Sequence, residues 1–235
     1  MTLRFSLSSH SDRGRSPVQH DRFLQAPFDG GLLVAVMDGV GKRKEAGVAS
    51  ESVRCALEEY ISRNAQVAKE TPVSALHQAS ARAIASLAHT VGATTCTALL
   101  LLEDGRAAVG HIGDCVAFRC REGVLSLLAK PDRSEEGLRT HSLHREVTGP
   151  RTATAGWRAW MEKPSEPGDV YLLASDGCWE SVRTAGLKRT LTAPEPWERA
   201  AEDLVRASLD AGSTDNITVV LVRVELPGRE ALPEA

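Results

Sequence analysis

The stretch LLVAVMDGVGKRKEAGVAS, residues 32–50, joins an apolar run to a glycine-containing turn and a helix-like segment. The run from Leu32 to Met37 predicts a buried strand, because strands covered on both faces are apolar at nearly every position. It ends abruptly at Asp38-Gly39, so a carboxylate lies at the tip of this strand. A surface turn would account for the pattern, and so would a metal site, provided that other carboxylates occupy the same kind of position.

Further runs of the same kind follow along the chain. They span residues 95–102, 106–112, 115–120, 124–129, 169–175 and 217–225. The separators 103–105 and 121–123 each end in glycine after charged residues, which is typical of hairpin turns with positive φ. The middle of the chain is therefore predicted to be an antiparallel meander.

Three segments have the apolar spacing of helices. The apolar positions are Ala49, Val53, Leu57, Tyr60 and Ile61, then Val73, Leu76, Ala83, Ile84 and Leu87, and finally Trp197, Ala201, Leu204 and Val205. These helices would cover the apolar strands, which predicts an α+β fold with helices on both outer faces of the sheets. No repeat or linker divides the chain, so residues 1–235 are predicted to form one domain, with an irregular segment at 130–168 and a tail at 226–235.

The composition excludes several classes of partner. The chain has 235 residues, of which 42% are hydrophobic and 4% aromatic, and its net charge is only −3. Neither nucleic acid nor a membrane surface is an expected partner of such a chain. Five cysteines without a C-x-x-C pair indicate a reducing compartment, and the N-terminus lacks the apolar stretch of a signal peptide, so a cytoplasmic location is expected.

Four carboxylates occupy strand ends or the turns between strands. They are Asp38, Asp114, Asp176 and Asp215. Each alone is more simply explained as a turn residue, but ends of adjacent strands converge at one edge of a sheet, and clustered carboxylates repel one another without a cation. The four together therefore predict a site for hard divalent cations such as Mg²⁺ or Mn²⁺.

Five motifs, taken in their order along the chain, resemble those of a known protein family. They are VAVMDGVG…AGVAS, GATTCTALLL, AAVGHIGDCVAFRCREG, YLLASDGCWE and TDNITVVLVRV. In order and spacing they resemble the type-2C metal-dependent serine/threonine protein phosphatases, the PPM family, in its bacterial form and over about residues 11–225. The resemblance implies a four-layer α-β-β-α sandwich with two central antiparallel sheets flanked by helices.

The resemblance also implies a ligand set for two ions of Mn²⁺ or Mg²⁺, with a looser third site. Asp38 would bridge the first two ions, and Gly39 would offer its carbonyl oxygen. Asp176 and Asp215 would complete the coordination of the first ion. These two acids and Asp38 would be the essential catalytic ligands. Asp114 would hold the third ion.

The sequence departs from the family pattern on the N-terminal side of the site. Asp21 matches the last acid of an Asn-Glu-Asp motif and would contact the second ion directly or through water, but Gln19-His20 replace the other two residues. The phosphate-binding arginine of the family is expected at Ser16, so Arg15, and less closely Arg13, are the candidates for that role.

Two further departures concern proton transfer and the flap that borders the site in the family. Val40 replaces a histidine that some members use as a general acid, which leaves His141 and His144 as candidates. The 130–168 segment corresponds to the flap and is shorter than expected.

The expected activity is that of a phosphoprotein phosphatase, a phosphoric monoester hydrolase that cleaves phosphoserine and phosphothreonine with a metal-bridging hydroxide. The alternative is a pseudophosphatase that binds a phosphoprotein or a kinase without efficient turnover. The expected partners are a phosphorylated protein and a serine/threonine kinase or its targets, and the chain is expected to be monomeric.

Overall fold

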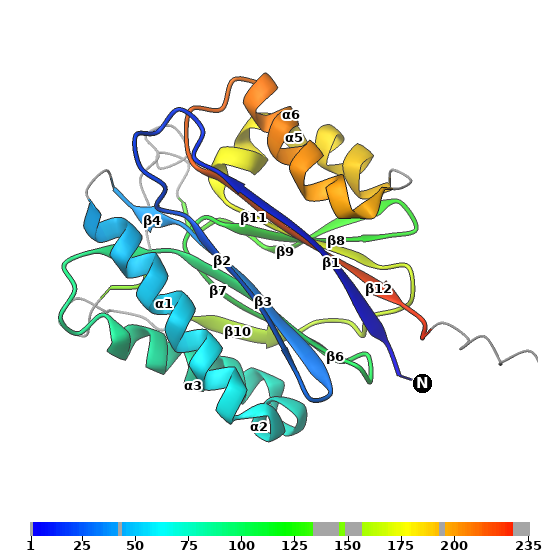
Figure 1. Ribbon diagram of the computed structural model, residues 1–235. Helices are drawn as coiled ribbons and strands as arrows, with labels where there is room; N and C mark the ends of the chain where they lie inside the picture. Colours follow the sequence, from blue (N-terminus) through cyan, green and yellow to red (C-terminus); the bar gives the residue numbers. More distant parts are fainter. Residues whose placement is uncertain (1, 42–43, 134–145, 149–156, 193–195, 228–235) are drawn as a thin grey trace, which may run out of the picture.

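The computed structural model describes residues 2–41, 44–133, 146–148, 157–192 and 196–227. Two five-stranded antiparallel sheets lie between two layers of helices (Figure 1). The first sheet has the order β1 (Arg4–Asp12), β12 (Ile217–Glu225), β11 (Val170–Ala174), β8 (Val116–Arg121) and β9 (Val124–Ala129). The second has the order β10 (Arg158–Met161), β7 (Ala107–Ile112), β6 (Cys96–Leu102), β3 (Gly31–Met37) and β2 (Arg22–Phe28). A short pair, β4 (Gly39–Val40) and β5 (Ala93–Thr94), extends the region beyond β3.

The helices cover the outer faces of the two sheets. The second sheet is covered by α1 (Lys44–Arg63), α2 (Ala65–Glu70) and α3 (Pro72–Ser86), and the first by α5 (Asp176–Thr192), η1 (Trp197–Arg199) and α6 (Ala200–Asp210) (Figure 1). The four-layer α-β-β-α sandwich implied by the family resemblance is therefore confirmed. Among the described residues, no helix is both long and apolar enough to span a membrane.

Strand β3 is apolar without interruption because both of its faces are covered. Leu33, Ala35 and Met37 pack into the core shared with α1 and α3. Leu32, Val34 and Val36 point the other way, into the core between the two sheets. Since side chains alternate between the faces of a strand, a strand covered on both sides must be apolar at every position.

The predicted meander is wrong in one respect. β6 and β7 form one hairpin and β8 and β9 another, and the second turns at Glu122-Gly123, both with positive φ. However, β7 and β8 belong to different sheets, so the turn at residues 113–115 carries the chain across the sandwich. The reason is that β8 pairs with β11 instead of β7.

The periodicity did not predict seven of the elements that the chain forms, namely β1, β2, β4, β5, β10, α2 and α5. Within the 130–168 segment, residues 134–145 and 149–156 lie outside the described part of the chain. His141 and His144, the candidate proton donors, are among them.

Candidate metal centre

Strand pairing brings two predicted acids together at one end of the second sheet. Asp21 directly precedes β2, and Asp38 directly follows β3. Because Arg22 pairs with Met37, the two carboxylates lie next to each other beyond the last pair of the ladder. Asp21 is 2% exposed, and the backbone N–H of Asp38 donates to Thr95 Oγ1 at 3.1 Å.

The other three acids come from the same edge of the first sheet. They are Asp114 before β8, Asp176 after β11 and Asp215 before β12. Ala174 of β11 pairs with both Val116 and Val219, so these three strands end or begin side by side at this edge. The five acids predicted as ligands are therefore gathered where the two sheets meet.

A cavity of about 710 Å³ opens at this place. Its walls include five of the six predicted ligand residues, namely Asp38, Gly39, Asp114, Asp176 and Asp215. Asp21, the sixth, lies buried behind the wall and accepts a hydrogen bond of 2.7 Å from Ser175 Oγ. The structure thus brings together all the acids that the sequence placed at strand ends.

Gly39 allows the chain to turn closely past helix α1. A Cβ atom at this position would lie 2.6 Å from the carbonyl oxygen of Ala46 and 3.0 Å from Cβ of His20. No larger residue fits without moving backbone, so the contact between the strand tip and α1 requires glycine.

The acids perturb one another strongly. Burial, followed by the negative charges of Asp21 and the other site acids, raises the pKa of Asp38 well above its ordinary value. Burial also raises the pKa of Asp21 to about 7 and that of Asp114 to about 6, with repulsion from Asp176 adding to both. In the absence of a cation, protonation is the means by which such a cluster lowers its charge.

The hydrogen bonding of the acids leaves oxygen atoms available for a cation. Asp21 Oδ1, Asp114 Oδ1 and Asp176 Oδ1 are buried and, within the described part of the chain, have no hydrogen-bond partner. Buried polar atoms are normally paired, so these oxygens fit the ligand requirements of Mg²⁺ or Mn²⁺. Among the described residues, however, no three Asp, Glu, His or Cys side chains are already arranged around one point as a metal would require.

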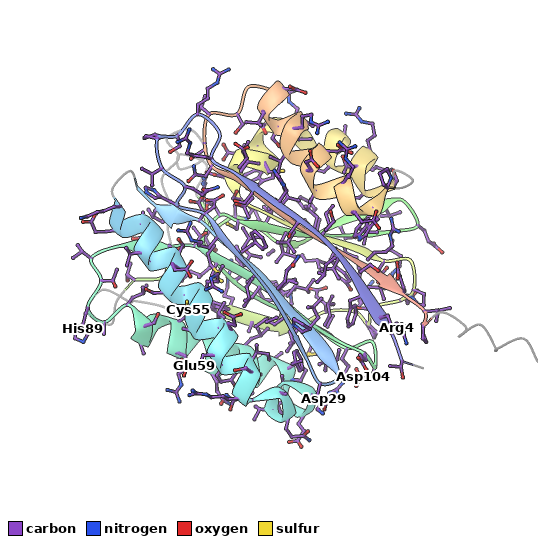
Figure 2. All side chains as sticks on the ribbon, viewed as in Figure 1. Arg4, Asp29, Cys55, Glu59, His89 and Asp104 are labelled. Carbon is purple, nitrogen blue, oxygen red and sulfur yellow. The ribbon has the colours of Figure 1, made fainter. Side chains whose placement is uncertain are left out.

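Ordinary turn acids of the same fold look different. Asp29 and Asp104 lie in the hairpin turns at the far end of the second sheet (Figure 2). Asp29 pairs with Lys69 at 2.6 Å, and Asp104 pairs with Arg106 at 2.7 Å. Each of these turn acids is neutralised by its own neighbouring cation, whereas the five acids of the cavity lie close enough together for their charges to raise the pKa of three of them.

The predicted phosphate-binding arginines lie outside the cavity wall. Arg13 and Arg15 are both exposed, whereas Ser16, the position at which the family arginine is expected, lines the cavity. Asn216 holds this loop: its Nδ2 donates to the carbonyl oxygens of Arg13 at 2.9 Å and Val18 at 3.0 Å.

His20, the replacement for the family glutamate, is buried beside this loop. Its backbone N–H donates to Asn216 Oδ1 at 2.7 Å, and its Nδ1 lies 3.0 Å from the carbonyl oxygen of Gly41. Its Nε2 is buried and, among the described residues, has no hydrogen-bond partner.

One residue of the cavity escaped the sequence prediction. Arg133 lines the cavity, and its Nη2 contacts both Asp114 Oδ2 and Asp176 Oδ2, the latter at 2.7 Å. Its Nη1 contacts Glu180 on the first turns of α5. The only signal in the sequence is an arginine a few residues after β9, which by itself predicts nothing.

The chain that forms this cavity is similar to known protein phosphatases. The family model described as protein phosphatase 2C matches residues 8–218. The serine/threonine protein phosphatase PstP of Mycobacterium tuberculosis is 26% identical over 239 residues, which cover 95% of this chain and 46% of that protein. A probable protein phosphatase 2C 59 of Arabidopsis thaliana is 31% identical over 156 residues, which cover 56% of this chain and 50% of that protein. The chain thus spans about half the length of these curated relatives.

Solved structures agree with the sequence matches. The crystal structure of the Mycobacterium tuberculosis PstP phosphatase has a TM-score of 0.80 at 26% identity and covers 96% of this chain and 100% of that one. The catalytic domain of PstP in complex with 2 manganese ions has a TM-score of 0.79 at 27% identity, with the same coverage. The matched residues 8–218 include every strand-end acid of the cavity. The chain belongs to the protein phosphatase 2C family.

Proposed function

We propose that this chain is a metal-dependent phosphatase that hydrolyses phosphoserine and phosphothreonine in proteins, with Mn²⁺ or Mg²⁺ as cofactor. The observation that supports this most is the convergence of five acids from both sheets, three of them with buried oxygens that have no hydrogen-bond partner among the described residues. The similarity to PstP, whose catalytic domain is described with 2 manganese ions, supports the same metal class.

In this proposal, Asp38 would serve both of two ions, Asp176 and Asp215 would help to hold the first, and Asp21 with the Gly39 carbonyl would help to hold the second. When bound, such ions lower the pKa of water and offset the charge of a phosphoryl group. The protein holds the ligands in place: Ser175 fixes Asp21, and the close packing of Gly39 on α1 fixes the tip of β3.

Arg13 and Arg15 remain the proposed phosphate-binding residues. They belong to the loop whose residues Ser16, Pro17 and Val18 line the cavity, so a guanidinium could approach the phosphate from the rim. An arginine suits this role because its planar donors match the phosphate oxygens.

The first test compares Asp176→Asn with a matched control, Asp104→Asn, in the hairpin turn at the far end of the sheet. Both remove one carboxylate charge, but only Asp176 lines the cavity. Phosphate release from a phosphothreonine peptide is expected with Mn²⁺, is expected to stop on chelation, and is expected to fall at least about 100-fold in Asp176→Asn, by analogy with the loss of other essential metal-site groups. Circular dichroism checks the fold of both variants, and full activity of a folded Asp176→Asn protein would contradict the proposal.

The exposed positions of Arg13 and Arg15 favour a second candidate, a pseudophosphatase that binds a phosphoprotein without turnover. Titration calorimetry with Mn²⁺ and a phosphopeptide, run beside the activity assay, separates the two. Binding of both ligands without phosphate release would establish the pseudophosphatase, and release would exclude it.

A further inference from the structure

Arg133 lines the candidate metal centre, and within the described part of the chain its terminal nitrogens contact only carboxylates. Its side chain is 1% exposed. One nitrogen, Nη2, is shared between Asp114 Oδ2 and Asp176 Oδ2, and the other, Nη1, pairs with Glu180. Of the described residues that line the cavity, Arg133 is the only lysine or arginine.

The shared nitrogen occupies the place that a metal ion held by Asp114 and Asp176 would need. Nη2 is 2.7 Å from Asp176 Oδ2, and a bound Mg²⁺ would lie at roughly 2.0–2.1 Å from its oxygen ligands. An ion bound by the same two oxygens would therefore overlap the nitrogen atom. Two cations in this space would also repel each other, so occupancy by one excludes the other.

Helix α5 keeps the guanidinium in this position. Asp176 and Glu180 are four residues apart on the helix and face Arg133 together. The neighbouring Trp179 Nε1 donates to the carbonyl oxygen of Asp114 at 3.1 Å, which ties the β7–β8 turn to the same helix. Paired carboxylates on both sides hold an arginine more firmly than one surface partner does.

From this arrangement, and resting on the proposed function, we infer that Arg133 is a built-in cation that occupies the third metal subsite. The Asp114–Asp176 subsite is closed by the chain itself. Two ions, served by Asp38, Asp21, Asp215, the Gly39 carbonyl and Asp176 through its Oδ1 atom, complete the centre. The enzyme is thus a two-ion phosphatase. The Arg133 side chain takes the place of a third ion and neutralises the carboxylates of Asp114 and Asp176.

The test counts the Mn²⁺ ions bound per chain by electron paramagnetic resonance. Mn²⁺ is added to the folded protein until its sites are saturated. The wild-type protein is expected to bind two ions. Arg133→Gln, which removes the charge at similar length, is expected to bind three. Arg106→Ala, which breaks the Asp104 ion pair in a turn far from the site, is the matched control and is expected to bind two.

Two additional variants locate the extra ion and guard against misfolding. Combining Arg133→Gln with Asp114→Asn is expected to return the count to two, because the third subsite loses a ligand. If Arg133→Gln does not fold, Arg133→Ala is used in its place, because it also removes the guanidinium charge. Three ions in the wild-type protein, or two in both folded Arg133 variants, would overturn the inference and leave the metal-dependent function intact. No bound Mn²⁺ in any of these proteins would instead refute the proposed function, and the inference with it.

Discussion

Ser175 shows how a single buried hydroxyl prepares the candidate metal centre. It is fully buried between the two sheets, donates to Asp21 Oδ2 at 2.7 Å and accepts the backbone N–H of Thr218 at 2.9 Å. Ser175→Ala removes both of these hydrogen bonds. We expect Mn²⁺ affinity to fall by about 10–100-fold, the usual effect of losing a group that orients a metal ligand. Titration calorimetry with Mn²⁺ measures it.

Ser181, in the helix α5 that follows Ser175, provides a matched control. Among the described residues, Ser181 Oγ donates to the carbonyl oxygens of Gly177 and Cys178 within α5 and to no other atom. Ser181→Ala is expected to leave Mn²⁺ affinity within the error of the measurement. Equal affinities of the wild-type and Ser175→Ala proteins would show that Asp21 does not depend on this hydroxyl.

At the same scale, the limit of sequence-based prediction is a matter of distance along the chain. Asp38 could be found because its strand and its terminal carboxylate are adjacent in sequence. Arg133 could not, because its partners Asp114 and Asp176 are 19 and 43 residues away. Ser175 lies within the motif YLLASDGCWE, but its bond to Asp21 spans 154 residues and depends on how the two sheets pack.

At the scale of elements, burial decided what could be predicted. β3 and β6 are buried at every position and were found from their apolar runs. β1, with the sequence RFSLSSHSD, forms the edge of its sheet and is mostly half-buried, so it carries no continuous apolar signal. α5 was missed because its periodicity is broken at Arg183, whose φ of 59° is not helical.

Strand β10 offers a test of how the described part of the 130–168 segment is anchored. Trp157, just before β10, is 3% exposed and packs against Gly110 of β7, where an added Cβ would lie 2.9 Å from its ring. Trp157→Ala is expected to lower the free energy of unfolding by about 3–5 kcal/mol, as is usual for large aromatic residues in cores. Urea denaturation followed by circular dichroism measures it.

Trp160, in β10 itself, is the control for this prediction. It is only half-buried at the edge of the inter-sheet core, and its Nε1 donates to Glu162 Oε1 at 2.5 Å. Trp160→Ala is therefore expected to cost less than Trp157→Ala. The reverse order would mean that β10, and not the residue preceding it, holds this part of the sheet.

For the molecule as a whole, the acidic cluster should make the metal-free protein less stable as the pH rises. The pKa of Asp21 is about 7 in the folded state against 3.8 ordinarily, and that of Asp114 is about 6. Between about pH 4 and 7 the folded state therefore holds more protons than the unfolded state, so stability falls as pH increases through this window. Divalent ions bind the ionised carboxylates, so saturating Mn²⁺ is expected to offset the loss and to stabilise most at high pH.

Asp21→Asn removes one titrating acid of the cluster together with its repulsion of Asp38. In the presence of a chelator, the variant and the wild-type protein are expected to have similar urea midpoints at pH 5, where Asp21 is largely protonated. At pH 8 the variant is expected to be more stable by on the order of a few kcal/mol, since one pKa unit corresponds to about 1.4 kcal/mol. Glu51, whose pKa is lowered to about 2 by Arg54, titrates below this range and leaves the comparison undisturbed. A variant that is less stable than the wild-type protein at pH 8 without metal would refute the idea that repulsion among the ionised carboxylates destabilises the metal-free protein.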